Sequence, residues 1–287
     1  MKTEMRKLLP LLLAACFFAS CVRRPPVVSD PRPVLTVSYE PLRYFVETLA
    51  GDRYRVVTIA PPDAVPETYE PTPRQMVEVS NSMAYFRFGT LGFEGTRLRR
   101  ITQSSPHLYA VNTSEGITLM EHGESSDSED PHIWLSPANV RIMAHNIFQA
   151  LCNIDKDSTK YYSARLQRFE TFVDSVDAVV RERLASVSSR TFLINHPALG
   201  YFARDYGLRQ ICVEHDGKEA SAARMASLIR ACRKERVNVI FLQKAHVGRT
   251  ARRIAEETGI RLVEVHPLAY DWGAEMLHLS EQLARHE

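Results

Sequence analysis

Four residues that can bind a metal ion each stand next to a proline, at points where a loop joins a regular element. They are Glu67, His132, His196 and His266, in the pairs Pro66-Glu67, Pro131-His132, His196-Pro197 and His266-Pro267. Proline fixes its own φ and stiffens its neighbour, which helps to hold a ligand in place before the metal arrives. A single histidine in a loop would indicate little, but the repeated context indicates a metal site.

The segments around these residues alternate between strand and helix patterns. Short apolar or β-branched runs predict strands, and runs with apolar residues every three or four positions predict helices. Such alternation predicts parallel sheets covered by helices. The predicted strands are 34–39, 54–60, 83–88, 108–112, 191–195, 210–213, 239–242 and 261–265, and the predicted helices are 41–50, 73–81, 137–154, 199–206, 221–235, 249–258 and 274–285.

One long segment interrupts this alternation. Residues 157–187 contain neither Gly nor Pro, and their apolar residues recur every three or four positions, from Leu166 to Leu184. At 1.5 Å per residue this predicts a helix of roughly 45 Å. We therefore expect an α/β protein of two lobes, each a parallel sheet flanked by helices, joined by one long rigid helix. The expected limits are 34–155 for the N-terminal lobe, 156–188 for the linking helix and 189–287 for the C-terminal lobe.

The candidate ligands lie where such a fold binds its ligands. In open α/β sheets, ligands bind beyond the carboxyl ends of the strands. His196 and His266 each directly follow a predicted strand, so both are expected at the same edge of the second sheet. Glu67 lies in the loop after strand 54–60, and His132 precedes the helix that begins after Ser136, its expected N-cap.

The N-terminus has the pattern of a secretory signal. Basic residues precede an apolar stretch at 8–19, whose twelve residues would span about 18 Å as a helix, too short for a bilayer core of about 30 Å. Residues 1–20 are therefore expected to be a signal peptide. Cys21 follows Ala19-Ser20 as in a bacterial lipobox, which predicts lipidation at Cys21; Cys16 is the alternative, and a secreted protein cut near Ser20 is a third. The proline-rich residues 21–33 predict a tether of roughly 35–40 Å.

Charge and cysteine content exclude several classes of protein. The formal net charge is +2, and residues 1–20 contribute three of the basic residues and one of the acidic ones, so the rest of the chain is neutral. Nucleic-acid binding is therefore not expected. Beyond the signal, Cys152, Cys212 and Cys232 lack CxxC spacing, so they predict neither a disulfide framework nor a zinc ribbon, although one disulfide stays open. No GxSxG, P-loop or HExxH motif is present.

Several segments carry a family resemblance. The chain resembles the metal-binding lipoproteins of bacterial zinc and manganese ABC importers, the cluster A-I solute-binding family, and its zinc type in particular. The resemblance runs from about Val34 to the C-terminus. The matching segments are YEPTPR at 69–74, DPHIWLSP at 130–137, HPALGYFARDYGL at 196–208 and VHPL at 265–268.

The resemblance implies a metal bound between the lobes, with two departures at the liganding positions. Members usually have His where this chain has Glu67 and Asp where it has His266, so the count of three imidazoles and one carboxylate is kept. Because zinc favours nitrogen-rich tetrahedral sites and manganese prefers more oxygen ligands, we expect Zn²⁺ as the transported ligand. The resemblance further implies a monomeric, extracytoplasmic lipoprotein, anchored to the membrane, that performs no chemistry and hands its ion to a membrane permease.

Alternatives remain at this stage. The ion could be Mn²⁺ or Fe²⁺, or the protein could be a zinc-dependent hydrolase with Glu67 as general base and water as the fourth ligand. A third possibility is an adhesin with a structural metal. His215, His246 and Asp271 are spare candidate ligands, Asp271 being the first substitute for Glu67. The acidic loop 121–130 is either a solvated loop or a metal-collecting one.

Overall fold

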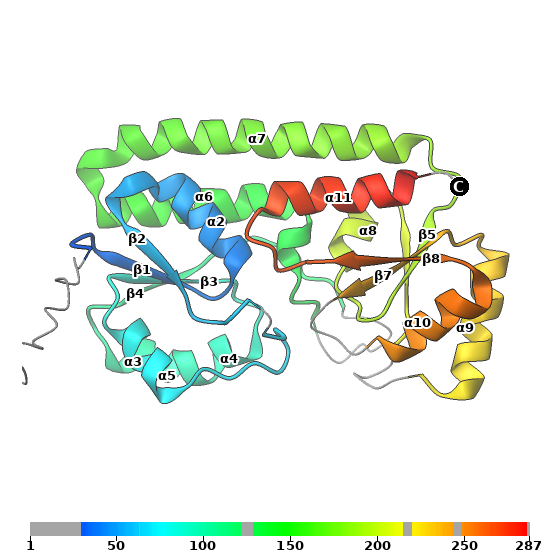
Figure 1. Ribbon diagram of the computed structural model, residues 1–287. Helices are drawn as coiled ribbons and strands as arrows, with labels where there is room; N and C mark the ends of the chain where they lie inside the picture. The colour runs from blue at the N-terminus through cyan, green and yellow to red at the C-terminus, as the bar shows by residue number, and fades with distance from the viewer. Residues whose placement is uncertain (1–29, 63, 122–128, 215–219, 244–247, 286–287) are drawn as a thin grey trace, which may run out of the picture. The chain divides into compact units, whose positions relative to one another are not determined.

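Two parallel sheets of four strands each organise the computed structural model, which describes residues 30–62, 64–121, 129–214, 220–243 and 248–285. The first sheet has the order β2-β1-β3-β4 and the second the order β6-β5-β7-β8 (Figure 1). All strand pairs within them are parallel, which confirms the predicted α/β class. The strands are β1 (Val34–Val37), β2 (Arg55–Thr58), β3 (Ala84–Arg87), β4 (Tyr109–Asn112), β5 (Thr191–Ile194), β6 (Arg209–Cys212), β7 (Val239–Gln243) and β8 (Arg261–Val265).

Both sheets have the same topology. In each, the first strand in the chain pairs with the second on one side and the third on the other. The chain therefore changes direction across the sheet beside β1 and again beside β5. A change of this kind leaves a crevice at the carboxyl ends of the strands, where α/β proteins bind ligands.

Helices cover both sheets. The first lobe has α2 (Glu40–Ala50), α3 (Pro73–Ser80), α4 (Gly92–Gly95), α5 (Arg97–Ser104) and α6 (Pro137–Ile154), and the second has α8 (Gly200–Tyr206), α9 (Ala222–Lys234), α10 (Arg249–Thr258) and α11 (Trp272–Ala284). The sequence did not predict α4 and α5, because α4 is a single turn and α5 buries only Leu98 and so has no apolar stripe. Short 3₁₀ turns lie at η1 (Gly51–Arg53), η2 (Ile133–Leu135) and η3 (Lys156–Ser158).

The expected long helix is α7 (Thr159–Ala185). Figure 1 shows it running along α6 of the first lobe and α11 of the second, and it packs against both. The apolar stripe read from the sequence is the buried face of this helix, which burial against both lobes stabilises far more than helix propensity does. Its buried residues are Tyr162, Leu166, Phe169, Val173, Val176, Val180 and Leu184.

Two tryptophans join the two lobes beside the candidate ligand His132. The Trp134 indole N–H donates to the carbonyl of Pro267 at 2.7 Å, and the Trp272 indole N–H donates to the carbonyl of Trp134 at 2.7 Å. Both side chains are almost completely buried. Because buried indoles need such partners, these bonds hold the loop that carries His132 against the C-terminal lobe.

The predicted signal peptide, Cys16, Cys21 and most of the tether lie outside the described residues. Within the parts of the chain that the structure describes, no helix combines the length and apolar character needed to cross a bilayer.

Candidate metal site

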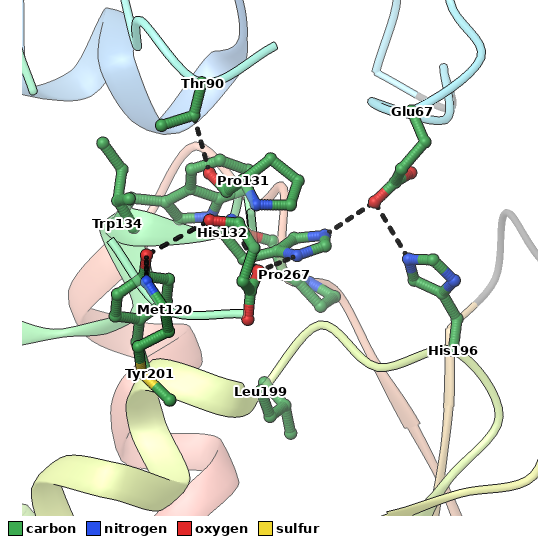
Figure 2. A network of polar contacts seen from close by, with 12 residues as sticks. Glu67, Thr90, Met120, Pro131, His132, Trp134, His196, Leu199, Tyr201 and Pro267 are labelled. Atoms are coloured by element: carbon green, nitrogen blue, oxygen red, sulfur yellow. Dashed lines mark hydrogen bonds and ion pairs between the residues drawn. The ribbon is translucent and has the colours of Figure 1, made fainter. Parts of the chain in front are cut away.

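Three of the four predicted ligands lie together between the lobes. Glu67 Oε1 is 3.0 Å from His196 Nε2 and 3.3 Å from His132 Nε2. One ligand atom from each residue lies within 4.8 Å of the others (Figure 2). Donor atoms around a tetrahedral zinc ion, with bonds of about 2.0–2.1 Å, are about 3.3 Å apart. The two carboxylate–imidazole spacings therefore fit a shared zinc ion, and the two imidazoles need only a small approach.

Glu67 is held by a turn anchored to the first sheet. The amides of Thr68 and Tyr69 both donate to the carbonyl of Val65, at 3.2 and 2.9 Å, so the chain turns around Glu67. The Tyr69 hydroxyl donates to the carbonyl of Ile59, just beyond β2, at 3.2 Å. The turn thus fixes where the Glu67 carboxylate points, although the side chain keeps 25% exposure.

His132 is oriented by the aspartate of its own motif. Asp130 Oδ1 accepts from the backbone amide of His132 at 2.9 Å and lies 2.8 Å from its Nδ1. Both residues are almost completely buried. A carboxylate at Nδ1 places the proton there and makes Nε2 the nitrogen that can bind a metal, the arrangement that metal-ligating histidines commonly have.

His196 projects from the end of the central strand of the second sheet. It follows β5 after one residue, Asn195, and is 7% exposed. Its Nε2 faces Glu67, and its Nδ1 lies 3.6 Å from Glu214 Oε2. Like His132, it therefore turns Nε2 toward the shared centre.

Opposite charges and burial set the pKa values of Glu67 and His196. Burial by itself would raise the pKa of Glu67, but the hydrogen bond from His196 and the charges of His132 and His196 outweigh it and lower the pKa. Burial would lower the pKa of His196, but Glu214 and Glu67 raise it to about 9. The carboxylate is thus ionised and stabilised by cationic character, which is the environment that a bound cation also supplies.

Comparison with known proteins shows the family of the chain. Residues 35–283 match the family described as zinc-uptake complex component A, periplasmic (ZnuA). The chain belongs to this family. It is 27% identical over 265 residues to the high-affinity zinc uptake system protein ZnuA of Bacillus subtilis, covering 88% of this chain and 83% of that one.

Two further matches are a solved structure and a relative named for a different metal. A crystal structure of ZnuA superposes with a TM-score of 0.83 and 32% identity, covering 88% of this chain and 98% of that chain. The iron-binding protein YfeA of Yersinia pestis is 26% identical over 226 residues, covering 74% of this chain and 70% of that one. Membership of the family is therefore shown, and the chain is similar both to a relative named for zinc uptake and to one named for iron binding.

His266 does not join the group that Glu67 centres. Its side chain is 52% exposed, its Nε2 lies 3.5 Å from Glu264 Oε1, and its backbone amide donates to Glu275 at 2.9 Å. The sheet order explains the separation. His266 follows β8, and β7 lies between β8 and β5, so the two strand ends are two inter-strand spacings apart, roughly 10 Å. Residues at the same edge of a sheet need not lie close enough to bind the same ion, and a ligand role for His266 stays a prediction.

The spare candidates fall into two groups. Asp271 caps α11, its carboxylate accepting from the amide of Ala274 at 2.9 Å. His215, His246 and residues 122–128 of the acidic loop lie outside the described residues. The residue that sequence reasoning missed is Glu214, which no motif marks and which only the pairing of β5 with β6 brings to His196. It lies two residues beyond β6, and His196 lies two residues beyond the neighbouring β5.

Proposed function

We propose that this chain binds one Zn²⁺ between its lobes through Glu67, His132 and His196 and delivers it to the membrane permease of an ABC importer. The observation that carries the proposal is the single carboxylate oxygen within 3.3 Å of two buried imidazole nitrogens. Membership of the zinc-uptake family supports it. Lipidation at Cys21, an extracytoplasmic location and a monomeric state belong to the same proposal.

The donor set supports zinc over manganese. Two imidazole nitrogens and one carboxylate are ligands that zinc accepts in a four-coordinate site, whereas manganese favours more oxygen donors and a higher coordination number. Two neutral imidazoles and one carboxylate leave the bound divalent ion with a local charge of +1. Because one relative is named for iron, the identity of the bound metal is the property to measure.

The position of Glu67 argues for a binding protein rather than a hydrolase. A general base must stand beside the metal-bound water and not in the ligand set. Here the Glu67 carboxylate contacts both imidazoles at their Nε2 atoms, which supports a ligand role for Glu67 rather than that of a base. The relatives' names describe uptake and metal binding, which supports the same conclusion.

The test is elemental analysis of the purified mature protein, with metals counted per chain after exposure to equimolar Zn²⁺, Mn²⁺ and Fe²⁺. We expect one zinc per chain and much less of the other ions. A ligand at 1,000 times its Kd adds about 4 kcal/mol to the folded state, so Zn²⁺ should raise the melting temperature by several degrees. The matched control is the triple variant of Glu67, His132 and His196 to Ala. Equal retention of zinc by this control, or a preference for another metal, would contradict the proposal.

A further inference from the structure

Each metal-facing imidazole has a carboxylate behind it, and the two carboxylates come from different lobes. Asp130 lies at Nδ1 of His132, and Glu214 lies at Nδ1 of His196. We infer that Glu214 is a positioning residue of the metal site, which accepts the Nδ1 proton of His196 and so presents Nε2 to the ion. This inference rests on the proposed function and adds the residue that orients the ligand from the C-terminal lobe.

The fold places Glu214 beside His196 by strand pairing. Ile194 and Cys212 are partners in the last register position of β5 and β6. The pairing continues past both strands, because the amide of Glu214 donates to the carbonyl of Asn195 at 3.0 Å. Two residues beyond each strand, His196 and Glu214 therefore lie side by side, held by the backbone of the sheet.

The geometry gives Glu214 a supporting position and not a ligand position. Its carboxylate lies 3.6 Å from His196 Nδ1, whereas Glu67 lies 3.0 Å from Nε2 on the opposite side of the ring. Within the described part of the chain, the group whose ligand atoms lie within 4.8 Å of one another contains Glu67, His132 and His196 and does not include Glu214. His196 therefore has Nε2 available to the proposed ion and Nδ1 facing the Glu214 carboxylate.

The burial of the Glu214 carboxylate is unfavourable unless the carboxylate has a hydrogen-bond partner. The side chain of Glu214 is 11% exposed, and that of His196 is 9% exposed. A buried carboxylate needs compensating partners, because its desolvation is unfavourable. An N–H at Nδ1 is such a partner when zinc occupies Nε2, and the carboxylate in turn makes the imidazole a stronger ligand.

The experiment compares zinc affinity in Glu214→Ala, Glu214→Gln and the control Glu235→Ala, each in the full mature chain. Glu235 lies in the same lobe and pairs with Arg209 at 3.4 Å, away from the site. Competition with a chelator of known affinity gives each Kd. Removing an outer carboxylate of this kind costs about 10- to 100-fold in metal affinity, so we expect that loss in Glu214→Ala, a smaller loss in Glu214→Gln, which keeps an oxygen acceptor, and none in the control.

A spectroscopic readout separates orientation from general stability. Long-range ¹H–¹⁵N correlation spectra of the zinc-loaded protein report which nitrogen of His196 carries the proton. We expect Nδ1–H in the wild type, with slowed proton exchange that speeds up in Glu214→Ala. The metal count stays at one per chain in all variants, and the visible spectrum of the Co²⁺-substituted protein stays unchanged, because the set of ligands is the same.

Each contrary result has its own meaning. Affinities of the Glu214 variants equal to that of Glu235→Ala, or a proton on Nε2 in the zinc-loaded wild type, would overturn the positioning role while leaving the proposed function intact. A changed Co²⁺ spectrum in Glu214→Gln would overturn it too, by making Glu214 a ligand. A wild-type protein that binds no zinc would overturn the proposed function and this inference with it.

Discussion

Replacing Glu67 with Ala removes the one residue of the group that both imidazoles contact. Its carboxylate lies 3.0 Å from His196 and 3.3 Å from His132, and it is the only anionic member of the three. Losing even an outer partner of a metal ligand costs about 10- to 100-fold in metal affinity, so losing a direct ligand should cost at least the upper end of that range. Because the Glu67 side chain is 25% exposed and water can take the vacated position, we expect a loss of about a hundredfold in Kd, which is about 2.7 kcal/mol.

Interactions that Glu67 makes in the metal-free protein reduce the expected loss of zinc affinity, and they predict a second measurable effect of the substitution. Glu67 already interacts favourably with His196 and His132 before the ion arrives, since those contacts hold its pKa below the ordinary value. Part of the carboxylate's interaction energy is therefore present in both states and cancels in the binding free energy. For the same reason Glu67→Ala should also lower the pKa of His196, because the carboxylate is one of the groups that raise it.

The assay is competition with a chromophoric chelator, and the matched control is Glu70→Ala. Glu70 stands three residues further along the same loop, where its side chain is 52% exposed and pairs with Arg97. We expect zinc affinity in the control within about threefold of the wild type. If Glu67→Ala bound zinc as tightly as Glu70→Ala, the ligand role would be refuted. Turnover of a hydrolysable substrate that vanished in such a variant would favour the general-base alternative.

Three further outcomes are expected. Zinc affinity should fall about tenfold per pH unit below about pH 9, because zinc displaces a proton from His196, whose pKa is raised to about 9. Zinc titrations at about pH 8.5, 7.5 and 6.5 measure this slope, and an affinity that does not change with pH would contradict the prediction. His266→Ala should leave Kd within about threefold, since its side chain is half exposed outside the group; a hundredfold loss would restore it as a ligand. Glu94→Ala should destabilise the metal-free fold by about 3 kcal/mol, because the buried amide of Phe88 and the half-buried amide of Gly89 lose their acceptor. Thermal melts should show a fall of about 6–12 °C, and an unchanged melt would contradict this.

The fold was predictable because its signals are local. The strand cores and most helices could be predicted from the spacing of apolar residues and from Gly and Pro residues that end a helix or strand. Helix α6 and strand β8 have the same limits as predicted from the sequence. The Ser136 cap is also confirmed, since its side chain accepts from the amide of Asn139. What the sequence could not supply was strand order. Alternation of strands and helices is the same whether β5 lies next to β8 or two strands away, and only the three-dimensional sheet distinguishes these.

The same limit explains the outcome at the site. His132, His196 and Glu67 could be proposed from motif and proline context, and the structure brings these three together; their ligand roles stay predictions. His266 was included because it follows a strand of the same sheet, an argument that fixes an edge but not a distance. Glu214 was overlooked for the complementary reason. It belongs to no motif read from the sequence, and its link to His196 exists only through the pairing of β5 with β6.

This arrangement bears on the exchange of residues between the lobes. The sequence suggested that Glu67 in place of His and His266 in place of Asp compensate one another, keeping three imidazoles and one carboxylate. In the structure the two positions are not equivalent, since Glu67 lies within 3.3 Å of both His132 and His196, whereas His266 is half exposed and lies outside this group. If the group binds the ion as proposed, a change at 67 alters the set of ligands and a change at 266 does not. On this basis Glu67→His alone, without His266→Asp, should convert the group to three imidazoles, raise its local charge by one unit and make zinc release more sensitive to acid.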